Sequence, residues 1–338
     1  MMSSLYFGFA VVFSVMVIVD LVGNTLVVLV VLQNESMKTP VNYLLVNLAT
    51  ADVLVGIFFG IQFIIAPALT HPENNTGDFL CKFVTGGVLG WVGAVASVFS
   101  LVAIAIERYY AVMFPHSPRG KLTKTKIAIF AIVSWVLALL WAGVGFFTTA
   151  YDRDKKSCDI SWSKEIYANV YTVGWTVVAG VMPLSIMGFL YARVVYRLWF
   201  TNQECDVTQM ALLRYRKRVT KLVIAVTIVY ALCWVPELTI YFLGFTGAIQ
   251  LQTIHINIAS ALVFFNSTVN PVVYALQSSI FRGHLSNLIC ACCQKDWRSN
   301  QVNPALEPYP IVSAQRRLPF VVSDEREESE IVLQEGAK

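Results

Sequence analysis

Five charged side chains inside long apolar runs are the residues best placed to do chemistry in this 338-residue chain. Where such runs cross a membrane, an ionisable group is costly to bury and is a functional candidate by default. Glu107 and Arg108 are notable because a carboxylate directly precedes a guanidinium at the end of an apolar run. The full set is Asp20, Asp52, Glu107, Arg108 and Glu237.

Asp52 lies in the middle of its run, and polar side chains occur near the same depth in other runs. Oxygen donors that converge on a carboxylate can hold a hard monovalent or divalent cation. The same donors can instead satisfy a buried acid through hydrogen bonds and water. Residue types alone leave both interpretations open for the set Asn24, Ser97, Asn266, Ser267 and Asn270.

The elements that must position these residues are apolar segments that cross a membrane. Hydrophobic residues make up 57% of the chain and charged residues only 14%, against roughly 25% charged in soluble domains. Each run reaches the ~20 residues that a helix needs to span the hydrocarbon, and lipid admits only helices or closed barrels. The sequence therefore predicts an all-α membrane protein, a seven-helix bundle with spans at about 5–32, 41–69, 83–113, 126–148, 168–198, 219–244 and 254–276.

The basic residues orient the bundle. Lys and Arg are concentrated in the loops that are cytoplasmic if the N-terminus is outside, including "RYRKR" before the sixth run. A glycosylation sequon at Asn74 follows the second run and agrees, although sequons arise by chance. We expect a plasma-membrane protein with an extracellular N-terminus and a cytoplasmic C-terminus.

The cysteines divide by compartment. Cys81 and Cys158 are the two that face the oxidising side, which predicts a disulfide between them. On the inner side, Cys290, Cys292 and Cys293 are either acylated by lipid or idle reduced thiols.

The chain divides into a membrane domain, residues 1–293, and a tail, residues 294–338. The tail has too little apolar content to fold alone, which predicts disorder. Between the last span and the tail, residues of about 278–290 predict a short amphipathic helix on the inner leaflet.

Prolines interrupt three consecutive spans at Pro183, Pro236 and Pro271. Proline removes a backbone hydrogen bond and favours a kink, and kinked helices can pivot as a switch requires. Proline is also simply common in membrane helices.

A set of motifs, one or two per span and in order along residues 5 to about 293, resembles the rhodopsin-like (class A) G-protein-coupled receptors, of the peptide-receptor type. The motifs are Gly23-Asn24, "NLATAD" ending at Asp52, Cys81 with Glu107-Arg108-Tyr109, Trp135, Pro183 with Tyr191, Cys233-Trp234-Val235-Pro236 and Asn270-Pro271-Val272-Val273-Tyr274.

This resemblance implies an activation switch. Arg108 would be held by Glu107 at rest and freed to meet a heterotrimeric G protein, and Trp234 would be a toggle beneath the ligand. Tyr191 and Tyr274 would swing in on activation, and the tail would offer a site for arrestin. The whole implied switch is Glu107, Arg108, Tyr109, Tyr191, Trp234, Pro236, Asn270, Pro271 and Tyr274.

The resemblance also favours a resting-state sodium ion. Its ligands would be Asp52, Ser97, Asn266, Ser267 and Asn270. Otherwise no cofactor is expected, and retinal is excluded because the seventh span has no lysine to form a Schiff base.

Two features depart from the family pattern. The family often has an acid at the inner end of the sixth span that restrains the arginine, whereas "RYRKR" is wholly basic. Elevated basal signalling is therefore expected. The stretch from Cys81 to Arg108 is two residues longer than usual, and Gly86-Gly87 could absorb the excess as a distortion.

The ligand pocket has one acidic candidate. Gly90 stands where amine receptors carry an aspartate, whereas Glu237 follows the proline of the sixth span. Glu237 is either an anchor for a cationic ligand or a structural acid, protonated or hydrogen-bonded to Tyr241. The remaining candidates for the lining are Trp91, Gln62, Trp175, Tyr241 and Phe264.

A short peptide with a basic or amidated end fits an acidic, aromatic pocket best, and a small cationic molecule or a lipid is the alternative. Membrane lipids are the other expected partners, and no nucleic acid is. A transporter or channel is disfavoured because the chain lacks internal repeats. An enzyme is disfavoured because no nucleophile stands with a base and no metal-ligand spacing occurs.

Overall fold

The computed structural model describes residues 2–115, 122–200, 207–277 and 279–289. Within them, seven helical segments are long and apolar enough to cross a membrane. The prediction of an all-α, seven-helix membrane bundle is therefore confirmed. The segments are Phe7–Gln33, Pro40–Ala68, Asn75–Met113, Lys124–Thr148, Glu165–Phe200, Leu212–Phe245 and Thr253–Leu276.

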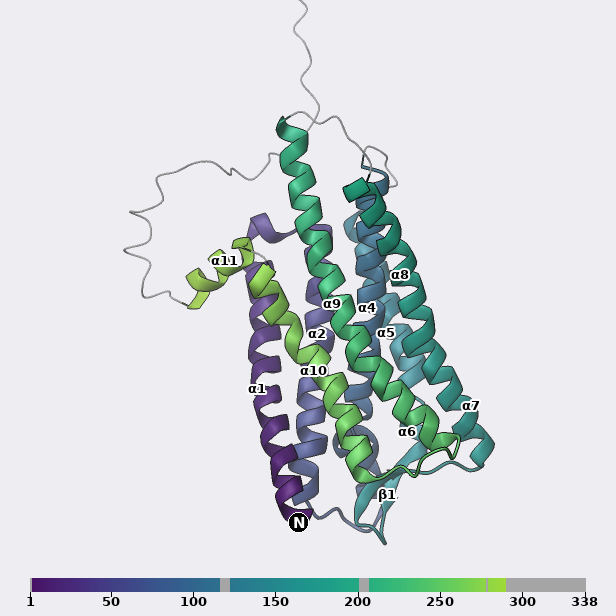
Figure 1. The fold of residues 1–338 in the computed structure, drawn as a ribbon. Coiled ribbons are helices and arrows are strands. Elements are labelled where there is room, and N and C mark those ends of the chain that lie inside the picture. Colours follow the sequence, from purple (N-terminus) through teal and green to yellow (C-terminus); the bar gives the residue numbers. More distant parts are fainter. Residues whose placement is uncertain (1, 116–121, 201–206, 278, 290–338) are drawn as a thin grey trace, which may run out of the picture.

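Figure 1 shows the helices running up and down in one bundle, with α11 at one end and a two-stranded hairpin at the other. We call these the α11 end and the hairpin end. The main helices are α1 (Met2–Gln33), α2 (Pro40–Gly60), α4 (Val88–Met113), α5 (Lys124–Ala142), α7 (Glu165–Thr176), α8 (Met182–Val195), α9 (Val207–Phe245), α10 (Thr253–Gln277) and α11 (Ser279–Ile289). Short helices are α3 (Asn75–Leu80) and α6 (Gly145–Thr148), and 3-10 turns are Glu35–Met37 and Ala66–Ala68.

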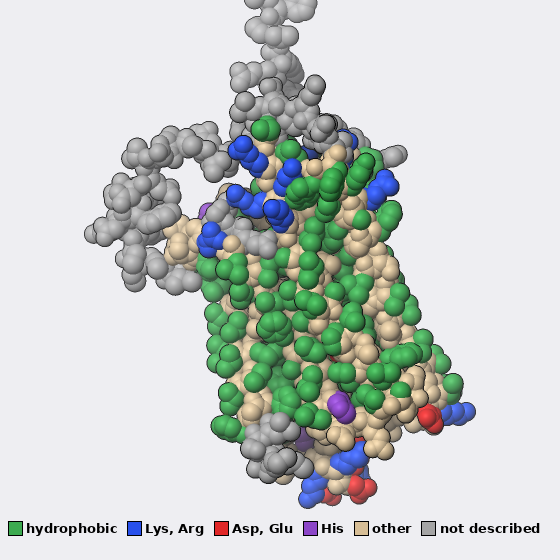
Figure 2. Space-filling view, viewed as in Figure 1, with side chains coloured by type: hydrophobic (Ala, Val, Ile, Leu, Met, Phe, Trp, Pro, Cys, Tyr) green, Lys and Arg blue, Asp and Glu red, His purple; other side chains and the backbone are tan. Residues whose placement is uncertain are grey.

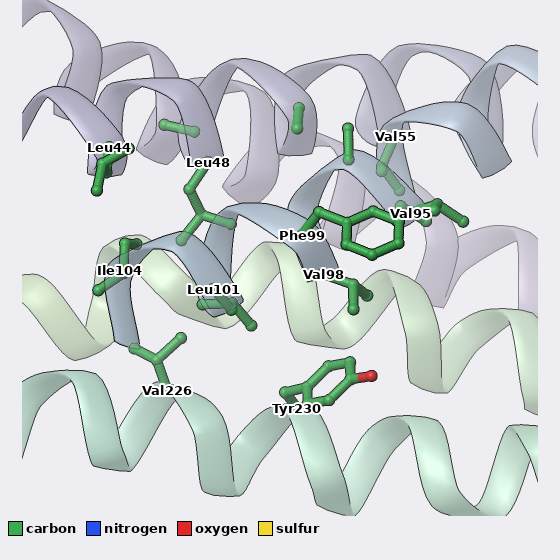
Figure 3. Packing of buried hydrophobic residues seen from close by; sticks show 14 of the residues in the cluster. Leu44, Leu48, Val55, Val95, Val98, Phe99, Leu101, Ile104, Val226 and Tyr230 are labelled. Atoms are coloured by element: carbon green, nitrogen blue, oxygen red, sulfur yellow. The ribbon is translucent and has the colours of Figure 1, made fainter. Parts of the chain in front are cut away.

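Helix α4 is the centre of the bundle. It packs against α2, α5 and α8, and the third crossing is the most buried of the seven. Figure 3 shows apolar side chains of α2, α4 and α9 meeting in one packed core. Its labelled members include Leu44, Leu48, Val55, Val95, Val98, Phe99, Leu101, Ile104, Val226 and Tyr230. Most residues on α4 are therefore surrounded by protein rather than lipid.

Local chemistry sets where several helices begin. The Thr39 hydroxyl accepts a hydrogen bond from the Asn42 backbone N–H, and Pro40 occupies the first turn of α2, where its missing N–H costs nothing. Thr123 caps α5 in the same way.

Helix α9 begins at Val207, well before the predicted start of the sixth span at 219. The basic stretch in between consists largely of good helix formers and extends the helix.

Within the ranges that the structure describes, four π-helical segments interrupt the helices, at Ile61–Ile65, Cys81–Thr85, Val177–Val181 and Tyr196–Phe200. The second leads into Gly86 and Gly87, where Gly87 has a φ of 74° and its absent Cβ would lie 1.9 Å from Gln62 Oε1. Only glycine tolerates both conditions. The expected distortion of the third span therefore lies at these two glycines.

The three prolines have different surroundings. Pro183 lies in the first turn of α8, directly after the π segment Val177–Val181, so the fifth span is interrupted just before its proline. Pro236 and Pro271 lie inside α9 and α10, which remain continuous helices.

The hairpin end carries a two-stranded antiparallel sheet that we had not predicted, formed by β1 (Thr149–Asp152) and β2 (Ser157–Ile160). A disulfide joins Cys158 of β2 to Cys81, with a Cα–Cα distance of 5.4 Å. The predicted disulfide is thus confirmed.

In the turn between β1 and β2, the backbone N–H groups of Lys155 and Asp154 donate hydrogen bonds to the Asp152 carboxylate. These hydrogen bonds lower the pKa of Asp152.

The predicted amphipathic helix corresponds to α11, which follows α10 after a single residue. Cys290, Cys292 and Cys293, and the tail 294–338, lie outside the described residues.

Candidate functional site

The adjacent pair Glu107 and Arg108 is buried near the α11 end of α4. Their side chains are exposed by only 4% and 7%. Arg108 Nε donates to Glu107 Oε2, and its Nη2 donates to Oε1 at 2.5 Å. This bidentate pairing is the strongest geometry available to a guanidinium and a carboxylate. Arg108 is therefore held on its own helix.

Among the described residues, Glu107 is the acid that forms an ion pair with Arg108, and no second one does. Arg216 on α9 is close enough for its charge to interact with that of Arg108, and two like charges repel. The Tyr191 side chain on α8 lies near both members of the pair. Tyr274 on α10 is near enough to Tyr191 to interact with it, and its hydroxyl has no hydrogen-bond partner in the described part of the chain. Tyr109, in contrast, packs its ring edge-on against Tyr110 and Phe114.

Asp52 is the centre of a buried polar cluster. Asn270 Nδ2 donates to Asp52 Oδ2 at 2.7 Å, and the Ser97 and Ser267 side chains lie close to the same carboxylate. The structure therefore brings these four predicted residues together from α2, α4 and α10. Asn266 is also buried on α10, but no hydrogen bond among the described residues joins it to Asp52.

Several oxygens of this cluster have no hydrogen-bond partner in the described part of the chain. Buried polar atoms normally find a partner, yet four oxygens here have none among the residues described. They are Asp52 Oδ1, Ser97 Oγ, Asn266 Oδ1 and Asn270 Oδ1. A carboxylate, amide carbonyls and a hydroxyl are the ligands that hard cations prefer, so the residues present fit a cation.

Glu237 lies on α9 one turn closer to the hairpin end than Cys233, and it is 1% exposed. The Trp175 indole of α7 interacts with its carboxyl group, while Oε2 has no hydrogen-bond partner in the described ranges. Tyr241 is close enough to interact with Glu237 electrostatically, but its hydroxyl interacts with Ser260. Tyr241 is thus a neighbour of the acid rather than its hydrogen-bond partner.

Aromatic rings connect Glu237 to the other predicted pocket residues. The ring centroids of Trp91 and Trp175 are 5.7 Å apart, and those of Trp175 and Trp234 are 6.3 Å apart. The ring centroid of Phe59 lies 5.2 Å from that of Trp91 and 5.8 Å from that of Phe264. The Gln62 side chain lies against Gly87, one turn before Trp91.

Sequence reasoning missed the roles of three residues. Phe59 joins Trp91 to Phe264 but resembled any other apolar residue of its span. The second residue is Tyr230, whose hydroxyl donates to the Ala179 carbonyl oxygen at 2.5 Å. That carbonyl belongs to the π segment of the fifth span.

The third missed residue is Asn47, which begins the "NLATAD" motif. It accepts from Trp135 Nε1 at 3.0 Å and donates to Ser100 at 2.7 Å and Ser134 at 3.2 Å. The motif itself was the available signal. Asn47 therefore joins α2 to α4 and α5, and Trp135 has a structural role there.

Asn74, the predicted glycosylation site, is exposed and caps α3. Its side-chain oxygen accepts from the Thr76 backbone N–H at 2.9 Å, which uses the oxygen rather than the amide nitrogen.

Comparisons with known proteins agree with this architecture. Residues 23–274 match the 7 transmembrane receptor (rhodopsin family). The chain is 29% identical to a QRFP-like peptide receptor of Branchiostoma floridae over 322 residues, covering 88% of this chain and 82% of the relative. It is 32% identical to the human substance-P receptor, covering 80% and 68%, and 32% identical to the allatostatin-A receptor of Bombyx mori, covering 78% and 74%. Given seven spanning helices, the ordered motifs and this match over most of its length, the chain belongs to the rhodopsin family of G-protein-coupled receptors and is not an enzyme.

Proposed function

We propose that this receptor binds an extracellular short peptide at the hairpin end and activates a heterotrimeric G protein at the α11 end. The observation that carries the ligand class is the buried Glu237 carboxylate, with one unpartnered oxygen among aromatic rings. A basic side chain or an amidated terminus would supply the missing donors. The names of three relatives, which refer to a QRFP-like peptide, substance P and allatostatin A, support a peptide.

The orientation follows from the charges. Figure 2 shows hydrophobic side chains over the middle of the visible face, Lys and Arg near the α11 end, and Lys and Arg mixed with Asp and Glu at the hairpin end. The basic residues of α9 there are Arg214, Arg216, Lys217, Arg218 and Lys221. Cytoplasmic loops carry such an excess, so the α11 end is cytoplasmic and the hairpin end extracellular in the plasma membrane.

The resting receptor would hold a sodium ion at Asp52. Ser97 and Asn270 would contribute oxygens from α4 and α10, with Ser267 and Asn266 on the same helix as Asn270. Such an ion would supply positive charge to a buried carboxylate and stabilise one packing of α2 against α10. A state in which these helices shift would bind the ion less well.

The test is a screen of short amidated and free-acid peptides, with and without terminal arginine, against the receptor in membranes. Guanine-nucleotide exchange on added G protein is the readout. Glu237→Gln should weaken an active basic peptide roughly 5- to 150-fold, the equivalent of about 1–3 kcal/mol for a buried charged hydrogen bond.

The matched control is Asp159→Asn, which removes an exposed acid of the hairpin that pairs with Lys155. It should leave peptide affinity within about twofold, since exposed ion pairs contribute little. Equal potency of the peptide on the receptor and on Glu237→Gln would contradict the anchor.

A further inference from the structure

Asp20 on α1 is a buried acid of the bundle that neither the switch nor the peptide pocket uses. Its side chain is 0% exposed. Asn24 Nδ2 donates to Asp20 Oδ1 at 3.0 Å, while Oδ2 has no partner in the part of the chain that the structure describes. None of the four ion pairs formed by the described residues includes Asp20. A buried carboxylate with a single neutral donor is poorly compensated.

Asp20 points across the α1–α2 interface toward Gly56. A Cβ on Gly56 would lie 2.2 Å from Asp20 Oδ2, so the glycine leaves the space into which the carboxylate extends. Gly56 is one helical turn from Asp52, and the two carboxylates are close enough for their charges to interact. Both acids therefore face one region between the helices.

Asn24 connects the two acids. Its Nδ2 donates to Asp20 and also to the Ser267 carbonyl oxygen at 3.3 Å, and the Ser267 side chain lies close to Asp52. Asn24 Oδ1 itself has no partner among the described residues. Asn24 Oδ1 and Asp20 Oδ2 thus add two buried, unpartnered oxygens on α1 to those found around Asp52.

The charge of this extended cluster decides which ion it fits. Two ionised carboxylates with one sodium ion leave a net negative charge in the membrane core, whereas a divalent cation neutralises both. Calcium accepts six to eight oxygens at variable geometry, whereas magnesium requires an octahedron and retains water. Ligands fixed on four different helices favour the more tolerant ion.

We propose that Asp20 is a second carboxylate ligand of the cation site at Asp52. The site would bind Ca²⁺ in preference to Mg²⁺, and Ca²⁺ would compete with Na⁺ for it. This inference rests on the cation site in the proposed function and adds its charge, its ligand from α1 and its selectivity.

The experiment is thermal unfolding of the purified, ligand-free full chain in detergent, titrated with CaCl₂, MgCl₂ or NaCl at constant ionic strength. Calcium should stabilise the receptor at lower concentration than magnesium or sodium. In Asp20→Asn, the half-maximal calcium concentration should rise by at least about tenfold, because ligand charge governs calcium affinity. The sodium response should persist in Asp20→Asn and disappear in Asp52→Asn.

Two further variants complete the test. Gly56→Ala keeps both charges but displaces the Asp20 carboxylate, so it should weaken the calcium response even where Asp20→Asn accumulates poorly. Asp159→Asn removes an exposed acid of the hairpin and should leave every ion response unchanged.

The outcomes separate the two proposals. The same calcium dependence in the unaltered receptor, Asp20→Asn and Gly56→Ala, with sodium still acting through Asp52, would overturn the role of Asp20 alone. A receptor that responds to no ion would overturn the cation site at Asp52 as well.

Discussion

At the scale of single residues, buried polar groups without hydrogen-bond partners are the positions where a binding event or a helix movement can add a new contact. Glu237, Asp52 and Tyr274 each have a buried oxygen that no described group satisfies. Leaving such a group unpaired costs about 1–3 kcal/mol, so each is a place where a ligand, an ion or a moving helix can supply the partner. Tyr230 is the opposite case, because its hydroxyl is fully satisfied.

Tyr230→Phe should destabilise the receptor by about 1 kcal/mol or more, since it removes the donor to the Ala179 carbonyl and leaves that oxygen buried. The measurement is the melting temperature of purified receptor. Tyr196→Phe removes a hydroxyl from a residue that is 67% exposed and should have no such effect. Equal melting temperatures for the Tyr230 variant and the unaltered receptor would show that the hydrogen bond adds no net stability.

At the scale of elements, the basic part of α9 lies opposite the end of α4. Glu107 is the acid that pairs with Arg108, while Arg216 adds repulsion from α9. Nothing described there ties α9 to α4 through Arg108, which lowers the free energy needed to separate these helices. This arrangement supports the expectation of elevated basal signalling.

Arg216→Glu should lower ligand-independent nucleotide exchange, because it converts a repulsive contact into an attractive one with Arg108. Lys217→Glu is the control, because it makes the same charge change at a residue whose ammonium lies 5.4 Å above the Trp199 ring instead. A similar fall in both variants would indicate a general charge effect on G-protein binding.

The hairpin is the second element that the function depends on, since the disulfide fixes β2 to the start of the third span. The bridge closes a segment of 77 residues, which in the chain-entropy model corresponds to roughly 4 kcal/mol. A mild reducing agent should therefore lower peptide affinity and the melting temperature together. The Cys81→Ser/Cys158→Ser double variant should show both losses already and respond no further to reductant.

At the scale of the whole molecule, the bundle has a charged α11 end, an apolar middle and a disulfide-braced hairpin end. With this arrangement, the proposed ligand and G protein would contact the same helices at opposite ends of the bundle. Helix α4 carries Ser97 and the Glu107–Arg108 pair and packs on α2, α5 and α8. It is thus the physical link between the two ends.

The proposed orientation predicts that Asn74, at the hairpin end, is glycosylated in cells. Peptide-N-glycosidase treatment of the expressed receptor should increase its gel mobility, and Asn74→Gln should remove that shift. A receptor whose N-terminal epitope is reached by antibody only after permeabilisation would show the opposite orientation.

The sequence by itself determined the seven spans, the disulfide partners and the chemical types of the site residues. These depend on apolar length, compartment and local motifs, which are all readable along one chain. Residue types and positions along the spans also predict Trp91, Trp175, Phe264 and Glu237 as members of one pocket.

Only the tertiary structure decided which polar groups meet. Spans such as α1 and α2 are apolar all round, so their sequences do not tell which face turns inward. The contact of Asp20 with Gly56, the bridge from Tyr230 to Ala179 and the place of Phe59 between two rings all depend on how the helices are rotated. That rotation is set by packing among several helices at once, so no local sequence pattern predicts it.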